Sequence, residues 1–425
     1  MVYDLPYDSS DEPDSRSEVH RGVGVMARLP GSFLLLACLL ASCKKSGGDG
    51  GCPGRRDPAP SPLRVVRGPQ VAQVTETSLV LAWLSSAPAV GSVEYGTDPS
   101  FGSSASGPGG ATEHVLSLSG LLPRTLYYYR VLLDGAVASE GHTFLTAPAD
   151  PAIAIRIAVL GDSGAGNQAQ LDVAAGILSA NPEVVLITGD VIYDSGCPGE
   201  IDPHYFEPYS NLVDHIPFYP ALGNHDVLTQ RGQPLLDALY LPANDQDGTE
   251  RYYSFDHGGV HLVALDSNSS LEAGSPQYAW LEADLTQAGA TWLFVYFHHP
   301  PYSSSRHGSS TGIRASLEPL FNALGVDIVF TGHDHDYERT FPMSGGQVVD
   351  AASDPDYVDP GGTIYIVTGG GGRSLYPSGT RFFTAYSESV HHFVQVDVDG
   401  MQVTLRAIRD DGTVMDTMTI TKSGG

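Results

Sequence analysis

Positive charge is scarce in this sequence. Lys and Arg together number 22 against 49 Asp and Glu, which gives a formal net charge of −27 over 425 residues. A protein this negative repels the phosphate backbone of nucleic acids, so we expect no nucleic-acid partner. A small phosphate ester is still compatible with the charge, because bound metal cations can reverse the local field inside a site.

Long apolar runs are missing from the N-terminal region. The run from Phe33 to Leu40 is too short to cross a bilayer but is typical of the hydrophobic region of a signal peptide. It follows a short basic start at Met26 and ends in Leu40–Cys43, which resembles the cleavage box of bacterial lipoproteins. We therefore expect residues 1–42 to be a misread leader plus a signal peptide, and Cys43 to receive the lipid.

An ordinary secretory signal, cut nearby, is the alternative interpretation of this region. Both interpretations export the protein. With the lipid anchor, the expected location is the periplasm or the cell surface, and the anchor is the only expected contact with the membrane.

Cysteine is rare as well, with four in the chain. Cys38 would be removed with the signal and Cys43 would carry the lipid, which leaves Cys52 and Cys197. These two can form a disulfide in an oxidising compartment, or both can remain free thiols. Neither has the spacing of a zinc knuckle.

The composition divides the chain into segments. Residues 43–62 are rich in Gly, Ser, Pro and charge, which predicts a flexible tether. Residues 63–147 contain short alternating apolar stretches separated by Gly, Pro and Ser, which predicts a small β-sandwich. Trp83 and the stretch Leu122–Tyr127 resemble the fibronectin type III pattern. We find no internal repeat.

Residues 150–422 alternate between strand-like and helix-like patterns. This alternation favours a central sheet with helices on its outer faces, an α/β arrangement. Residues 392–421 are expected to form further strands, with a turn at Asp410–Gly412. The strands are expected at Ile155–Leu160, Val184–Thr188, Val260–Leu265, Thr291–Phe297, Asp327–Phe330 and Thr363–Thr368, and the helices at Gln168–Leu178, Pro276–Gln287 and Ile313–Leu324.

Metal-ligand side chains follow several of these expected strands. Because strand carboxyl ends meet at one edge of an α/β sheet, we expect the side chains to converge there. A buried carboxylate pair such as Asp162 and Asp190 needs cations to stay ionised. Two metal ions bridged by Asp190 would meet that need and leave positions open for water and substrate. The further candidates are Asn224, His298, His333 and His335.

The order of these motifs resembles that of the calcineurin-like metallophosphoesterases and, within them, the purple acid phosphatases. Most of the superfamily has His two residues after the first Asp, where this chain has Gly164. Purple acid phosphatases instead use a Tyr three residues after the bridging Asp, which matches Tyr193. The matching motifs are Gly161–Gly164, Gly189–Tyr193, Gly223–His225, Val295–His298 and Gly332–His335.

The resemblance implies a fold. The expected class is α/β (α+β), a four-layer metallophosphoesterase sandwich over residues 150–422. It is preceded by an all-β immunoglobulin-like or fibronectin III-like sandwich over residues 63–147, as in the plant-type enzymes.

The resemblance also implies a metal centre and a reaction. Asp162, Asp190, Tyr193 and His335 would hold Fe(III), and Asp190, Asn224, His298 and His333 would hold a divalent ion, either Zn, Mn or Fe. A metal-bound hydroxide would attack the phosphorus of a small phosphate monoester. His225 would contact the phosphate and His307 would protonate the leaving group.

The expected enzyme is thus an exported acid phosphatase with an acidic optimum. A phosphodiesterase or nucleotide-directed hydrolase on the same scaffold is the first alternative. A binding lipoprotein without catalysis is the second. The sequence indicates neither the natural substrate nor the oligomeric state.

Overall fold

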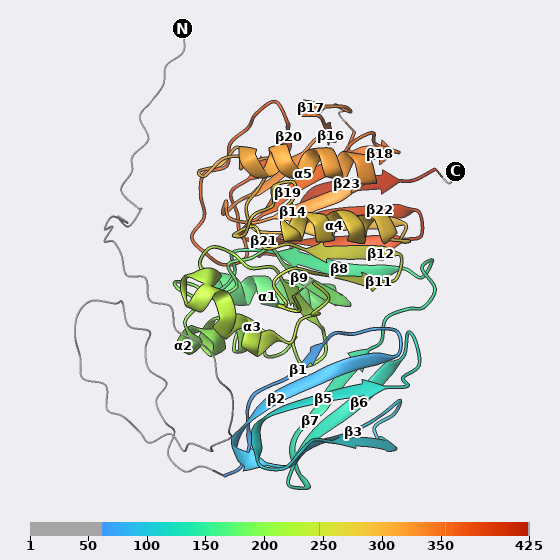
Figure 1. Ribbon diagram of the computed structural model, residues 1–425, viewed down its shortest axis with the longest axis vertical. Helices are drawn as coiled ribbons and strands as arrows, with labels where there is room; N and C mark the ends of the chain where they lie inside the picture. The colour runs from blue at the N-terminus through green and yellow to red at the C-terminus, as the bar shows by residue number, and fades with distance from the viewer. Residues whose placement is uncertain (1–61, 246, 353, 424–425) are drawn as a thin grey trace, which may run out of the picture. The chain divides into compact units, whose positions relative to one another are not determined.

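The computed structural model describes residues 62–245, 247–352 and 354–423 (Figure 1). The predicted signal peptide, the lipidation site Cys43, Cys52 and nearly all of the tether lie outside these residues. Cys197 is buried and disulfide-bonded. Within the part of the chain that is described, no helix is long and apolar enough to span a membrane.

Seven strands between residues 65 and 145 form two antiparallel sheets. Side chains from both sheets, among them Leu81, Trp83 and Tyr129, share one buried core, which confirms a β-sandwich. One sheet has the order β1 (Val65–Ala72), β2 (Ser78–Ala89), β5 (Ala111–Ser119). The other has the order β4 (Ser103–Ser106), β3 (Gly91–Gly96), β6 (Leu126–Leu133), β7 (Ala136–Leu145).

The connection into β6 is closed by a tyrosine. The backbone N–H of Leu122 donates a hydrogen bond to the Tyr127 hydroxyl at 3.0 Å. The same corner is found at this point of immunoglobulin-like sandwiches. Trp83 is 2% exposed and stacks on His114 at 5.2 Å between ring centroids, so it packs in the core.

Two seven-stranded sheets form the centre of the rest of the described chain (Figure 1). Strands β8, β9 and β10 run parallel to one another in the first sheet, and β12, β13, β14 and β19 do so in the second. The first sheet has the order β10 (Phe218–Pro220), β9 (Val184–Ile187), β8 (Ile155–Leu160), β21 (His392–Asp399), β22 (Gln402–Arg409), β23 (Val414–Thr421), β18 (Asp356–Val358). The second has the order β11 (Tyr253–His257), β12 (Val260–Ala264), β13 (Trp292–Tyr296), β14 (Ile328–Thr331), β19 (Ile364–Thr368), β15 (Tyr337–Thr340), β20 (Thr384–Glu388).

Helices cover the sheets from outside. Helix α1 (Gln168–Ala180) packs on β21 of the first sheet, and its N-cap Asn167 accepts a hydrogen bond from the Gln170 N–H. Helices α4 (Pro276–Gln287) and α5 (Thr311–Leu324) lie on the second sheet (Figure 1). The remaining short elements are α2 (Pro198–Ile201), α3 (Gln233–Leu239), the single turns η1 (Asp202–Phe206), η2 (Asp226–Leu228) and η3 (Gln230–Gly232), and the ribbon of β16 (Met343–Ser344) and β17 (Gln347–Val348).

Strand β13 shows how the layers are built. Phe294 and Tyr296 point into the core shared by the two sheets, while Val295 points into the core under α4 and α5. Because successive side chains of a strand face opposite sides, a strand buried on both faces is apolar throughout. The four-layer fold implied by the resemblance is confirmed. The single central sheet expected from the alternation of patterns is wrong, because the strands divide between two facing sheets.

The β-sandwich is joined to the first large sheet by hydrogen bonds. The Val71 N–H donates to the Val213 carbonyl at 2.8 Å, the Val74 N–H to the Tyr219 hydroxyl at 3.0 Å, and the Tyr129 hydroxyl to the Asp214 carbonyl at 2.6 Å. These partners lie in or just before β10.

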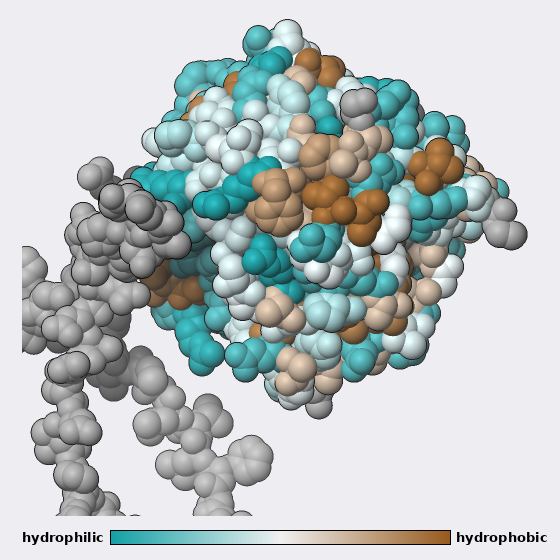
Figure 2. Space-filling model, turned by 90° about the horizontal axis from the view of Figure 1, so that it is seen from above, coloured by the Kyte–Doolittle hydropathy of each residue, from teal (hydrophilic) through white to brown (hydrophobic). Residues whose placement is uncertain are grey.

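The face seen in Figure 2 is mostly hydrophilic, with small separate apolar patches.

Candidate metal centre

Five loops bring the predicted ligands to one edge of the two sheets. Each loop leaves the carboxyl end of a parallel strand, namely β8, β9, β10, β13 or β14. The ligand follows within two to four residues of the strand end, so the backbone of a buried strand fixes its position. The five side chains placed in this way are Asp162, Asp190, Asn224, His298 and His333.

Three of the predicted ligands form one contact group. The Tyr193 hydroxyl donates to Asp162 Oδ1 at 3.0 Å and lies 3.2 Å from His335 Nε2. His335 Nε2 is itself 3.4 Å from Asp162 Oδ1. A carboxylate, a phenol and an imidazole therefore point at the same small volume.

The other ligands form a second group beside the first. Asn224 Oδ1 lies 3.0 Å from both His298 Nε2 and His333 Nδ1. Asp190 Oδ2 is 3.4 Å from His298 Nε2. Ligand atoms of Asp162, Asp190 and His298 all lie within 4.8 Å of one another, so the two groups are continuous and this buried trio can hold a metal ion.

The histidines are oriented as metal ligands are. His298 Nδ1 lies 3.1 Å from the Thr188 carbonyl oxygen, and His335 Nδ1 lies 2.7 Å from the Ser374 carbonyl oxygen. A carbonyl oxygen only accepts, so each Nδ1 carries a proton, and in the neutral ring the lone pair of Nε2 faces the cluster. Metal-binding imidazoles are commonly held by such a bond from the other nitrogen. Oxygen and imidazole donors together suit iron, zinc or manganese.

The electrostatics of the cluster favour positive charge. Asp162 and Asp190 are 0% and 1% exposed. Burial disfavours a charged His298, yet the carboxylates of Asp190 and Asp162 raise the pKa of His298 to about 9. Burial, together with the same two carboxylates, also holds the pKa of Tyr193 well above its usual value. The site therefore attracts a cation, either a proton on His298 or a metal ion.

Two glycines let the loops approach closely. A Cβ at Gly164 would lie 1.9 Å from the Val191 carbonyl oxygen, so no side chain fits where most of the superfamily has His. A Cβ at Gly223 would lie 2.1 Å from Asp190 Oδ1. Because position 164 has no room for a side chain, the residue that contacts Asp162 is Tyr193.

The two predicted catalytic histidines border the cluster. The backbone N–H of His225 donates to Asp190 Oδ1 at 2.9 Å, and its Nδ1 lies 2.6 Å from the Asp194 carbonyl oxygen. The exposed His307 ring lies 4.2 Å from the His333 ring, and its backbone N–H donates to Asp334 Oδ1 at 2.8 Å. Partial desolvation of its ring by the neighbouring side chains lowers the pKa of His307.

Sequence reasoning missed three residues at the site. The Tyr376 ring stacks on His335 at 4.1 Å, and the Arg373 guanidinium lies 4.5 Å from the centre of the Tyr193 ring. Both follow Gly369–Gly372, a stretch with neither helical nor strand periodicity. The four glycines were the sequence feature that indicated a close approach of this backbone to neighbouring residues. The third residue is Asp226, whose buried carboxylate accepts backbone N–H groups of Val191, Ile192 and Gly223 at 3.2, 2.9 and 2.7 Å.

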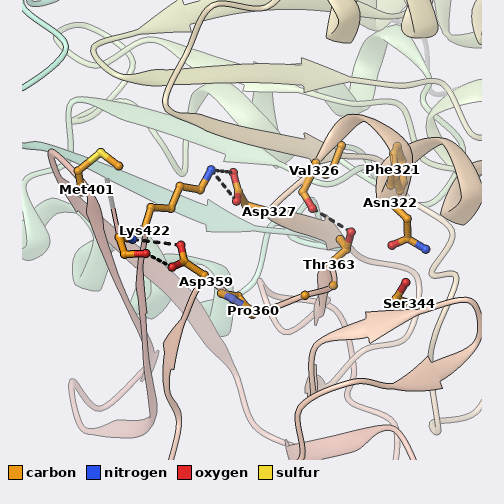
Figure 3. A pocket seen from close by; sticks show the side chains of 14 residues that line it. Phe321, Asn322, Val326, Asp327, Ser344, Asp359, Pro360, Thr363, Met401 and Lys422 are labelled. Atoms are coloured by element: carbon orange, nitrogen blue, oxygen red, sulfur yellow. Dashed lines mark hydrogen bonds and ion pairs between the residues drawn. The ribbon is translucent and has the colours of Figure 1, made fainter. Parts of the chain in front are cut away.

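A separate cavity of about 530 Å³ lies at the amino ends of β14 and β19 (Figure 3). The metal candidates follow carboxyl ends, so this cavity is not part of their site. Its charged groups are already paired: Lys422 Nζ lies 2.8 Å from Asp327 Oδ1, and Asp359 Oδ1 accepts the Ser423 N–H at 3.0 Å (Figure 3).

Known proteins resemble this chain in both sequence and fold. The calcineurin-like phosphoesterase family matches residues 155–337. Purple acid phosphatase 18 of Arabidopsis thaliana is 31% identical over 311 residues, which are 66% of this chain and 65% of that protein. Purple acid phosphatase 15 of the same plant is 30% identical over 295 residues, which are 61% of this chain and 53% of that protein. The chain thus spans between half and two thirds of these relatives.

A solved structure agrees with these matches. A purple acid phosphatase from yellow lupin (Lupinus luteus) seeds superposes with a TM-score of 0.76 at 21% identity, covering 84% of this chain and 74% of that one. At this identity the superposition shows the common fold. This chain therefore contains a calcineurin-like phosphoesterase domain and is a homologue of the purple acid phosphatases.

Proposed function

We propose that this protein is an exported phosphatase that hydrolyses phosphate monoesters at a binuclear metal centre, with an acidic optimum. The observation that carries the proposal is the cluster of seven ligand side chains in which two imidazoles present Nε2 inward. His298 and His335 are held that way by the Thr188 and Ser374 carbonyl oxygens. A closed structural site would need only four ligands.

The ligands divide into two sets that share Asp190. Asp162, Asp190, Tyr193 and His335 would hold trivalent iron, and Asp190, Asn224, His298 and His333 would hold zinc, manganese or iron. When bound, such a pair would activate water and neutralise charge on the transferring phosphate, and a trivalent ion would do so at a lower pH than a divalent one.

Two histidines of the chain would act on the substrate directly. His225 Nδ1 lies beside the Asp194 carbonyl oxygen, so the protonated Nδ1 leaves Nε2 free to contact a phosphate oxygen. His307 lies at the rim with its backbone tied to Asp334, where its ring can deliver a proton to the leaving oxygen. Asp334 also accepts the Gly308 N–H at 3.2 Å, which fixes the loop that carries His307.

The first test compares an aryl phosphate monoester with the matching diester from pH 4 to pH 8, using the protein with its native metals. Monoester hydrolysis that dominates below neutrality supports the proposal. Dominant diester cleavage at neutral pH would move the function to a phosphodiesterase. No hydrolysis of either ester by the metal-loaded protein would favour a binding lipoprotein.

Asp190→Asn tests the shared ligand. We expect the variant to bind less metal and to lose at least about 100-fold in kcat/KM, because one carboxylate would serve both ions. Asp399→Asn, which removes the same charge from the exposed end of β21, is the control. Retained metal and activity in Asp190→Asn would overturn the binuclear mechanism.

Export with a lipid anchor is proposed from the sequence alone, on the Leu40–Cys43 box. Incorporation of labelled fatty acid into the wild type but not into Cys43→Ser would support it. Equal labelling of the two would refute it.

A further inference from the structure

Several arginines of this acidic protein form no ion pair with a carboxylate. Most arginines of the described residues form ion pairs with Asp or Glu. Among residues 62–245, 247–352 and 354–423, the exceptions include Arg231 on η3, Arg306 in the loop after β13, Arg314 in α5 and Arg381 before β20. The whole chain has 49 acidic residues against 22 basic ones, so acidic residues outnumber the possible basic partners.

Two of these arginines line a cavity of about 580 Å³, which we call the arginine pocket. The Arg314 guanidinium lies 4.8 Å from the centre of the Tyr302 ring, so an aromatic face supports it. Phe382 is 65% exposed at the same cavity. The lining residues are Ser309, Thr311, Arg314, Arg381, Phe382 and Phe383.

The arginine pocket begins close to the loop that carries His307. Ser309 lies two residues after His307, so the pocket begins within about 7 Å of His307 along the chain. The Ser305 hydroxyl donates to the Pro377 carbonyl at 3.0 Å, which joins the His307 loop to the segment leading from Tyr376 to Arg381. Arg306, beside His307, lies 4.9 Å from the centre of the Tyr376 ring.

We propose that the arginine pocket binds an anionic group, a phosphate or a carboxylate, on the leaving-group side of the substrate. The inference rests on the proposed phosphatase function and names a substrate class for it: phosphate monoesters whose alcohol carries a second negative charge. Guanidinium groups bind both anions through paired N–H donors. The exposed Phe382 ring supplies a face for the apolar part of the same alcohol.

The cavity of Figure 3 provides a contrast within the same chain. There Lys422 is neutralised by Asp327 at 2.8 Å, so no free cation remains for a ligand. In the arginine pocket neither Arg314 nor Arg381 forms an ion pair within the described residues. Of these two cavities, the arginine pocket is therefore the one that combines arginines without an ion pair with closeness along the chain to His307.

The test uses a matched pair of esters on the full metal-loaded protein. 4-Carboxyphenyl phosphate and 4-carbamoylphenyl phosphate have similar size, and only the first carries the extra charge. We expect wild-type kcat/KM to favour the charged ester by about tenfold at low salt, the scale of two partly exposed ion pairs. 1,4-Phenylene bisphosphate replaces the carboxylate by a phosphate and identifies which anion is preferred.

Variants then assign the preference to the pocket. Arg314→Gln combined with Arg381→Gln should bring the ratio of the two kcat/KM values close to one. Arg381→Gln alone changes an exposed residue, so it should fold normally and give an intermediate ratio. Arg130→Gln removes the same charge from β6 of the β-sandwich and should keep the wild-type ratio.

The outcomes separate the two proposals. Hydrolysis of both aryl esters without preference for either anionic ester would overturn the arginine pocket and leave the phosphatase function intact. A preference that survives the double variant would also overturn it. Failure to hydrolyse any ester would overturn the phosphatase function and this inference with it.

Discussion

Replacing Gly223 by Ala tests how tightly the metal centre is built. Gly223 lies one residue before Asn224, in the loop after β10. A Cβ there would lie 2.1 Å from both the backbone N and Oδ1 of Asp190, the proposed shared ligand. Contacts under 3.0 Å essentially never occur for real Cβ atoms. The loop and Asp190 must therefore separate by about 0.9 Å, the difference between these two distances.

That displacement sets the size of the effect. Misplacing a reacting or ligating group by about 1 Å costs on the order of 100-fold in rate. Forcing a methyl group into a packed site costs about 1–3 kcal/mol of the free energy of unfolding. We therefore expect Gly223→Ala to bind less metal, to lose about 100-fold in kcat, and to unfold at a lower temperature.

The assay measures metal content, monoester hydrolysis and thermal unfolding on the same preparation. Gly289→Ala is the matched control, because a Cβ at Gly289 meets nothing within 4 Å. If Gly223→Ala kept the metal content and activity of the control, the close packing of this loop on Asp190 would not hold the site together.

Two further predictions concern a ligand and a buried histidine. Tyr193→Phe removes the hydroxyl 3.0 Å from Asp162 Oδ1. A bond between the Tyr193 phenolate and Fe(III) would give the metal-loaded protein a visible absorption band. The iron-loaded variant should lack this band, and a band of unchanged strength per iron would contradict phenolate ligation. Burial disfavours a charged His261, but its ring nitrogens donate hydrogen bonds to the carboxylates of Asp256 at 2.7 Å and Asp284 at 2.8 Å, which raise the pKa of His261 to about 9 from 6.5. The charged form therefore stabilises the fold fully below pH 6.5, and this contribution disappears as the pH rises through about 9. Urea unfolding should show a loss of about 2 kcal/mol across that window relative to His261→Gln, and equal pH profiles would contradict it.

The convergence of Asp162, Asp190, His298 and His333 was predictable from the sequence because each follows an expected strand, whereas β10, the strand before Asn224, was not expected. Strand β8 and helix α4 have the predicted bounds, Ile155–Leu160 and Pro276–Gln287. Strand β13 is shorter by one residue at each end than predicted. Where a strand is apolar throughout and a motif follows at once, local sequence alone decides where the side chain emerges.

The pairing of strands was not predictable in the same way. Alternating strands and helices indicate parallel neighbours, but they do not tell whether the strands join one sheet or two. Val159 of β8 and Leu262 of β12 are equally apolar, yet they belong to different sheets that face each other. Only the resemblance to a known family supplied the four layers, because sheet membership depends on contacts between distant segments.

The rim of the site was missed for another reason. Arg373, Tyr376 and Arg381 lie in the irregular chain between β19 and β20, where neither helical nor strand periodicity exists. Their positions depend on tertiary contacts, such as the 2.6 Å ion pair of Arg373 with Asp194 and the ring stacking of Tyr376 on His335. The contacts of such an irregular loop depend on the tertiary structure and cannot be predicted from its local sequence.

The hydrogen bonds between the β-sandwich and the approach to β10 have a consequence for how such proteins are inherited. Val71 and Tyr129 bond to the carbonyls of Val213 and Asp214, a few residues before the strand that leads to Asn224. Loss of the β-sandwich would remove these hydrogen-bonding groups from residues 213–219, the segment that leads to Asn224. The two parts are therefore expected to descend together, and exchanging the sandwich for an unrelated domain would require compensating substitutions along residues 213–219.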